Sequence, residues 1–103
     1  MDPSPFGLLQ ADYDEMLQAI RSFPDITKVT LFGSRAKGTD KPGSDVDLAI
    51  ETDSTNNRTA IELAIRLNEE TPLPYMFDVI DHQQINEPAL LDHIERVGVV
   101  IYP

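Results

Sequence analysis

The chain has 103 residues and a formal net charge of −10 at pH 7, from 18 acidic and eight basic side chains. This length supports one domain with a single core, and the negative charge repels long polyanions, which argues against extended nucleic-acid binding. Without cysteine, a membrane-length apolar run or signal-peptide features, the chain excludes disulfides and thiolate metal sites, and we expect a soluble, cytoplasmic protein.

The first third of the chain predicts a helix and a strand. Residues 1–7 contain two prolines and are expected to form a loose lead-in. Apolar residues then recur at helical spacing over Leu9–Phe23. Asp12 is a candidate N-cap, the alternative being a start one turn earlier, and Pro24 ends the helix. A short β-branched strand is predicted over Lys28–Phe32.

The strand is followed by a turn and a second strand. Gly33 breaks the first strand, and Ser34 is expected to cap a short helix, which continues into a loop over Thr39–Ser44. A strand over Asp45–Glu51 comes next. Its alternation places Asp45, Asp47 and Ala49 on one face and Val46, Leu48 and Ile50 on the other, so we expect one face to carry chemistry and the other to join the core.

The second half predicts two helices and two strands. An amphipathic helix is expected over Thr55–Glu70, with an apolar stripe made of Ala60, Ile61, Ala64, Ile65 and Leu67. A strand is predicted over Tyr75–Asp81, followed by a helix over Pro88–Val97 and a closing strand over Val99–Tyr102. The helix is expected to end at Gly98 as its C-cap and to face inward with Leu90, Leu91, Ile94 and Val97. The expected architecture is α/β (α+β): one domain over residues 1–103, with a mixed sheet of about four strands flanked by helices.

Two clusters together indicate a phosphate and metal site. A Gly33-Ser34 turn that opens a helix can bind phosphates through its backbone N–H groups, and the neighbouring Arg35 and Lys37 add positive charge. Asp45 and Asp47 project to the same side of their strand, as required for two carboxylates to share divalent cations. Because all these ligands are oxygens, the pattern favours Mg²⁺.

A third carboxylate is expected on the strand over Tyr75–Asp81. Asp78 and Asp81 are an odd number of residues apart, so they face opposite sides of a regular strand. An unpaired carboxylate at Asp78, in mid-strand among apolar residues, would be costly, whereas water can solvate Asp81 at the strand end. We therefore assign Asp78 to the site and treat Asp81 as an ordinary residue.

Each of these features also has a simpler interpretation. Gly33-Ser34 alone is most often a plain strand-to-helix turn, and Asp45 with Asp47 could be a solvated strand face. Asp78 could be a structural carboxylate. His82 and His93 are expected at the surface or an interface. The clusters occurring together favour the site.

The motifs carry a family resemblance over nearly the whole chain. The matching motifs are Gly33-Ser34-Arg35, the ten residues that separate Ser34 from Asp45, Asp45-Val46-Asp47 and the later Asp78-Val79-Ile80-Asp81. With these motifs, the chain resembles the polymerase-beta-type nucleotidyltransferase superfamily, and specifically its minimal MNT branch. The closing segment from Leu91 to Tyr102 is similar to the end of those small domains. The resemblance implies their fold and transfer of a nucleoside monophosphate from a triphosphate to a hydroxyl, with pyrophosphate leaving.

The resemblance also implies roles and partners. Gly33 and Ser34 would bind the β and γ phosphates, Arg35 and Lys37 would neutralise phosphate charge, and Asp45, Asp47 and Asp78 would be catalytic metal ligands for two Mg²⁺ ions. ATP is the expected nucleotide. MNT domains are typically antitoxins paired with a helical HEPN-domain toxin, and some transfer AMP to a tyrosine of that toxin.

Three functions follow from this resemblance. Because the chain lacks the extra helical domains of kanamycin-type enzymes, we expect an acceptor protein or a second copy of the chain to complete the cleft. The leading hypothesis is therefore an antitoxin that transfers AMP to a protein. The alternatives are a nucleotide-binding antitoxin that acts by occlusion and a transferase for a small molecule such as an aminoglycoside.

Overall fold

The computed structural model describes residues 6–38, 44–53 and 58–102. Its elements in chain order are α1 (Gln10–Arg21), β1 (Ile26–Phe32), α2 (Gly33–Lys37), β2 (Val46–Thr52), α3 (Thr59–Glu69), β3 (Phe77–Asp81), the 3₁₀ turn η2 (His82–Gln84), α4 (Pro88–Val97) and β4 (Val99–Tyr102). None of the helices in these described ranges is long and apolar enough to cross a membrane.

The four strands form one mixed sheet in the order β3-β2-β1-β4. β1 lies antiparallel to both β2 and β4, whereas β2 and β3 are parallel. The parallel pair needs a crossover, and α3 supplies it. The predicted mixed sheet of four strands flanked by helices is thus confirmed.

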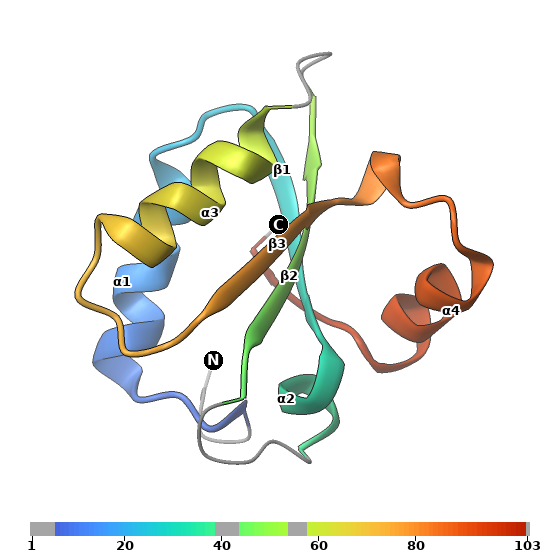
Figure 1. Cartoon of the computed structure of the whole chain (residues 1–103), viewed down its shortest axis with the longest axis horizontal. Helices are drawn as coiled ribbons and strands as arrows, with labels where there is room; N and C mark the ends of the chain where they lie inside the picture. Colours follow the sequence, from blue (N-terminus) through green and yellow to red (C-terminus); the bar gives the residue numbers. More distant parts are fainter. Residues whose placement is uncertain (1–5, 39–43, 54–57, 103) are drawn as a thin grey trace.

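Helices cover the two faces of the sheet unequally. Figure 1 shows α1 and α3 on one side of the sheet and α2 and α4 on the other. The main core lies under α1 and α3, and its largest fully buried side chains are Met16, Ile20, Leu31, Leu48, Ile50, Leu63 and Leu67. A smaller cluster of Phe32, Ala49 and Ile94 lies under α4. The β2 alternation behaves as predicted, because Val46, Leu48 and Ile50 all join the main core.

Several element ends differ from the predictions. Helix α1 begins at Gln10 with Leu9 as its N-cap, so Asp12 is not the cap; the Asp12 carboxylate instead accepts a hydrogen bond of 2.7 Å from the Tyr75 hydroxyl. The helix ends at Arg21, before Pro24. β1 starts two residues earlier than predicted and β3 two residues later. The ends of α4 and β4 match the predictions.

Residues 6 and 7, the described part of the predicted lead-in, contact the rest of the domain. Residues 1–5 and the predicted loop residues 39–43 lie outside the described residues. Phe6, however, is buried in the main core, and the carbonyls of Phe6 and Gly7 accept hydrogen bonds from Arg35. The lead-in prediction is therefore wrong for residues 6 and 7, because an aromatic ring and two polar contacts fix them.

The predicted buried stripe of α3 is confirmed for Ala60 and Leu67 but is wrong for Ile61 and Ile65. Of the predicted start, residues 55–57 lie outside the described residues, and the helix is described from Thr59. Its buried apolar residues are Ala60, Leu63 and Leu67, whereas Ile61 and Ile65 are exposed. Spacings of three and four residues put Ala60, Leu63 and Leu67 on one helical face, and tertiary packing selects that face over the adjacent one. α4 likewise buries Ile94 fully and Leu90, Leu91 and Val97 only partly.

Candidate active site

The acidic residues of β2 and β3 meet across the parallel strand pair. Asp47 is the register partner of Asp78 on β3 and of Phe32 on β1. Asp45 lies one residue before β2 and is exposed. Thus the structure brings Asp47 and Asp78 together beside the end of β1, where Gly33 begins α2.

Electrostatics show that this negative charge is poorly compensated. Burial raises the pKa of the Asp47 carboxyl above its usual range, and the neighbouring Asp78 and Asp45 raise it further. The charge of Arg35 partly opposes this shift in the Asp47 pKa. Because these surroundings disfavour the ionised form of Asp47, a cation bound beside it would offset the repulsion between the carboxylates and would itself be stabilised by them.

The exposure of Asp78 and Asp81 is the reverse of the one that we expected. Asp78 is exposed on the edge strand β3. Asp81 is the buried residue, and its Oδ1 accepts a hydrogen bond of 2.9 Å from the Gln83 N–H at the start of η2. The solvation argument was therefore wrong for both residues. The parity argument gives the observed arrangement, since the register pairs Asp78 with Asp47 and Asp81 with Ile50.

Gly33 is required by the space around Asp47. Its φ of +79° lies in the left-handed region, which favours glycine. A Cβ at this position would overlap Oδ2 of Asp47. α2 begins at Gly33 with Phe32 as its N-cap, so Ser34 lies inside the first turn and does not cap the helix as predicted. The turn and the β2 carboxylate are consequently in direct contact.

Arg35 faces the protein interior. It is 4% exposed, and its guanidinium donates to the Phe6 and Ser44 carbonyls at 2.8 Å and to the Gly7 carbonyl at 3.3 Å. The guanidinium also lies 5.2 Å from the centroid of the Tyr75 ring. These contacts join the N-terminal segment, the residue before Asp45 and the approach to β3. The contacts of Arg35 therefore help to position β2 and β3, the strands that carry Asp47 and Asp78.

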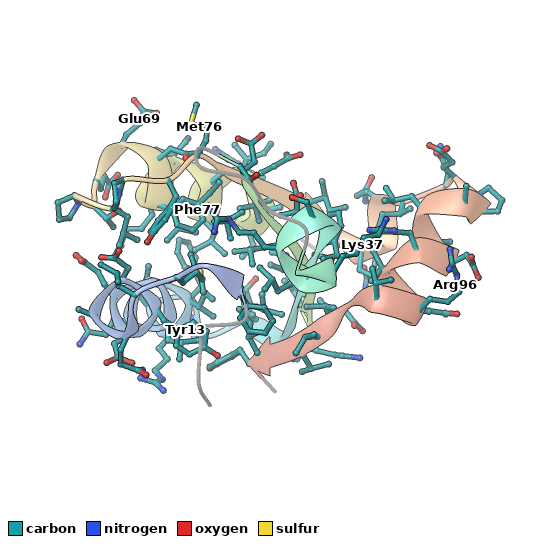
Figure 2. All side chains as sticks on the ribbon, turned by 90° about the horizontal axis from the view of Figure 1, so that it is seen from below. Tyr13, Lys37, Glu69, Met76, Phe77 and Arg96 are labelled. Atoms are coloured by element: carbon teal, nitrogen blue, oxygen red, sulfur yellow. The ribbon has the colours of Figure 1, made fainter. Side chains whose placement is uncertain are left out.

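Lys37, the other predicted phosphate-facing cation, is exposed at the end of α2. Figure 2 shows it on the teal α2 helix. Among the predicted cations of the site, Lys37 is thus the one whose ammonium group is open to solvent. Ser34, in the first turn of α2, is partly buried.

Two contacts at the site were not predicted from the sequence. The Gly33 N–H donates a hydrogen bond of 3.2 Å to Nε2 of His93 on α4. On β3, the Asn68 side-chain amide donates to the Phe77 carbonyl at 2.9 Å and accepts from the Phe77 N–H at 2.8 Å, so it caps the free edge of the strand that carries Asp78. Neither residue has a local sequence motif that could reveal its partner.

The site offers part of a metal centre. Within residues 6–38, 44–53 and 58–102, no three acidic or histidine side chains are close enough to hold a metal ion by themselves. The carboxylate oxygens of Asp45, Asp47 and Asp78 nevertheless suit Mg²⁺, which usually retains waters and takes phosphate oxygens as further ligands. The raised Asp47 pKa fits the same ion.

An apolar groove lies elsewhere. It has a volume of about 520 Å³ and is lined by residues of α3, the second half of β3, the segment that leads into α4 and α4 itself, including Ile61, Ile80 and Leu90. Its lining contains neither Asp47 nor Asp78. The acidic cluster, rather than this groove, therefore defines the candidate active site.

The fold and the site define a nucleotidyltransferase domain. The family model described as polymerase beta, nucleotidyltransferase matches residues 15–103, and the chain belongs to this family. Among solved structures, the chain is similar to a toxin–antitoxin crystal structure with AMP-PNP, with a TM-score of 0.72 and 25% identity over 87% of this chain and 72% of that one.

A second similar structure is a tri-AMPylated Shewanella oneidensis HEPN toxin in complex with an MNT antitoxin. Its TM-score is 0.67, with 22% identity over 90% of this chain and 71% of that one. A comparison with curated proteins gives no match. The shared fold is thus that of MNT antitoxins from HEPN/MNT pairs.

Proposed function

We propose that this protein is a magnesium-dependent nucleotidyltransferase that transfers AMP from ATP to a hydroxyl of a partner protein, and that it acts as the antitoxin of a HEPN-type toxin. The observation that carries the proposal is the pairing of Asp47 with Asp78 beside the Gly33 turn. This arrangement places carboxylates suited to metal binding next to a backbone turn whose N–H groups can bind phosphate. Family membership supports the reaction class.

Each site residue has a role in this proposal. Gly33 and Ser34 bind the terminal phosphates, and the exposed Lys37 neutralises their charge. Asp45 and Asp47 hold the metal ions, which supply charge neutralisation of the phosphates when bound. Asp78, exposed on the edge strand, is a metal ligand that faces the incoming acceptor and can take the proton of its hydroxyl.

The relatives support a protein as the acceptor. A similar structure holds an AMPylated HEPN toxin together with its MNT antitoxin. In the present chain, Asp78 lies on an edge strand, so another molecule can approach it from the side of β3. The net charge of −10 favours a partner with a basic surface.

The test uses ATP carrying label on either the α or the γ phosphate, together with Mg²⁺ and the protein encoded by the neighbouring gene. We expect only the α label to become attached to that protein, because nucleotidyl transfer retains the α phosphate. Transfer of the γ label would indicate a kinase, and no transfer with any of the four nucleotides would contradict the proposal.

A variant separates catalysis from occlusion. The double substitution Asp45→Asn, Asp47→Asn should bind the toxin but fail to neutralise it. If the variant still neutralises, the protein acts by covering its partner and the catalytic proposal is wrong. Asp53→Asn removes one negative charge from an exposed position after β2 and serves as the control.

A further inference from the structure

We propose that His93 competes with a phosphate for the Gly33 N–H. Its imidazole accepts the hydrogen bond of this N–H in the absence of nucleotide, and a phosphate oxygen replaces the imidazole as the acceptor when nucleotide binds. The inference rests on the proposed function, which assigns the Gly33 N–H to a phosphate. It gives a role to a residue on α4, outside the Gly-Ser and Asp-x-Asp motifs.

The geometry places the imidazole directly on the turn. The Gly33 N–H donates to Nε2 of His93 at 3.2 Å. The ring also packs edge-on against Phe32, the last residue of β1, with centroids 6.1 Å apart and an interplanar angle of 81°. Both residues that form the strand-to-helix junction are therefore in contact with His93, which is itself partly buried.

A single N–H cannot make good hydrogen bonds to both the imidazole and a phosphate. A phosphate oxygen bound at the turn would occupy the position that Nε2 now holds. Since Nε2 accepts the hydrogen bond, its lone pair faces the site, and that lone pair would repel an anionic oxygen. Binding of the phosphate therefore requires the ring to move away from Gly33.

The exchange favours charged ligands. A hydrogen bond from an N–H to an anionic oxygen is about twice as strong as one between neutral groups. A phosphate can thus displace the neutral imidazole, whereas a neutral ligand gains little by doing so. His93 consequently makes the turn selective for ligands with anionic oxygens, and it links the position of α4 to occupation of the site.

The first test compares two substitutions by calorimetric titration with Mg²⁺ and AMP-PNP, and with Mg²⁺ and inorganic tripolyphosphate. His93→Ala removes the competing acceptor, so we expect both ligands to bind about 2- to 10-fold more tightly, the worth of one net hydrogen bond. His93→Gln keeps an acceptor and should bind like the wild type. His82→Ala, a change of the other histidine, is the control and should have no effect.

The outcomes separate this inference from the proposed function. If the wild type binds neither ligand, the proposed nucleotide site is wrong. If the wild type binds but His93→Ala binds equally or more weakly, the site stands and the competition is refuted. Thermal unfolding of each variant shows whether it is folded under the conditions of the titration.

A spectroscopic measurement tests the contact itself. In nucleotide-free protein, ¹⁵N NMR of the imidazole should show Nε2 as an unprotonated acceptor, and the Gly33 amide resonance should shift in His93→Ala but not in His82→Ala. Adding Mg²⁺ and AMP-PNP should change the His93 signals and move the Gly33 amide to a new position. An imidazole spectrum that is unaffected by saturating nucleotide would overturn the proposal.

Discussion

At the residue scale, Gly33 and Asp47 depend on each other for space. Gly33 can be replaced only at a cost, because it has a positive φ and a Cβ would overlap Oδ2 of Asp47. Gly38 has a similar φ of +75°, but a Cβ there would meet nothing within 4 Å. The two glycines therefore separate the effect of backbone conformation from that of contact with the acidic site.

We predict that Gly38→Ala lowers the free energy of unfolding by about 1 kcal/mol, the cost of a left-handed conformation for alanine. Gly33→Ala should cost more, because Asp47 must also move, and it should abolish nucleotide binding. Chemical denaturation and calorimetric titration check the two effects. Equal stability loss and intact binding in both variants would contradict the role assigned to Gly33.

Asp47 gives a prediction for pH dependence. Because its folded-state pKa is raised above the ordinary value of 3.8, the folded chain binds a proton at a pH where the unfolded chain has released it. This contribution to stability is therefore lost as pH rises from about pH 4 towards neutral. Asp47→Asn should unfold at a higher temperature than the wild type at pH 7 without metal, and depend less on pH.

The same variant should lose transferase activity by at least about 100-fold, because a charged group is missing from the transition-state site. Mg²⁺ should raise the unfolding temperature of the wild type more than that of Asp47→Asn. Asp53→Asn, the exposed control, should resemble the wild type in all three measurements. A variant with normal activity and an unchanged response to Mg²⁺ would remove Asp47 from the site.

At the scale of elements, Arg35 joins segments that are distant in the sequence. Its guanidinium donates hydrogen bonds to the carbonyls of Phe6 and Ser44, and the ring of Tyr75 lies against it. The Tyr75 hydroxyl in turn donates to Asp12 on α1, and burial followed by this hydrogen bond raises the pKa of Tyr75. The hydroxyl therefore stays protonated at neutral pH.

We predict that Arg35→Lys and Arg35→Gln both lower the free energy of unfolding by at least about 2 kcal/mol, because neither side chain can bridge the same carbonyls. Both should reduce kcat. Lys37→Ala should leave stability within about 0.5 kcal/mol and mainly raise KM for the nucleotide. If lysine at position 35 restores both stability and activity, Arg35 acts through its charge on the phosphates instead.

The scale of elements also shows what the sequence could predict. Alternation assigned Val46, Leu48 and Ile50 to the core, and parity distinguished Asp78 from Asp81, because both depend on local geometry. The direction of Arg35 could not be predicted, since a five-residue helix has no strong periodicity. The contact between Gly33 and His93 spans 60 residues, and no local pattern encodes such a contact.

At the scale of the whole molecule, topology creates the site. The acidic residues come together only because α3 carries the chain across the sheet, so that β3 runs parallel to β2. α1 and α3 bury one face, while the other face carries Asp47 and Asp78 between α2 and the small core under α4. Figure 2 shows Tyr13 and Phe77 among the packed side chains, with Glu69 and Met76 at the periphery.

In the proposed function, a partner protein supplies the acceptor hydroxyl. Within the acidic cluster, Asp78 is exposed on the edge strand β3, and the net charge of −10 favours a basic partner over a polyanion. Family membership gives the reaction class, whereas the acceptor is part of our proposal. An experiment that detects AMP on the acceptor therefore tests the proposed function most directly.

The most direct measurement is the intact mass of the neighbouring gene product after incubation with this protein, ATP and Mg²⁺. The account predicts a mass increase of one or more AMP units, which is absent when Asp47→Asn replaces the wild type and present with Asp53→Asn. An unchanged mass in a mixture where the two proteins form a complex and the toxin is neutralised would contradict transfer.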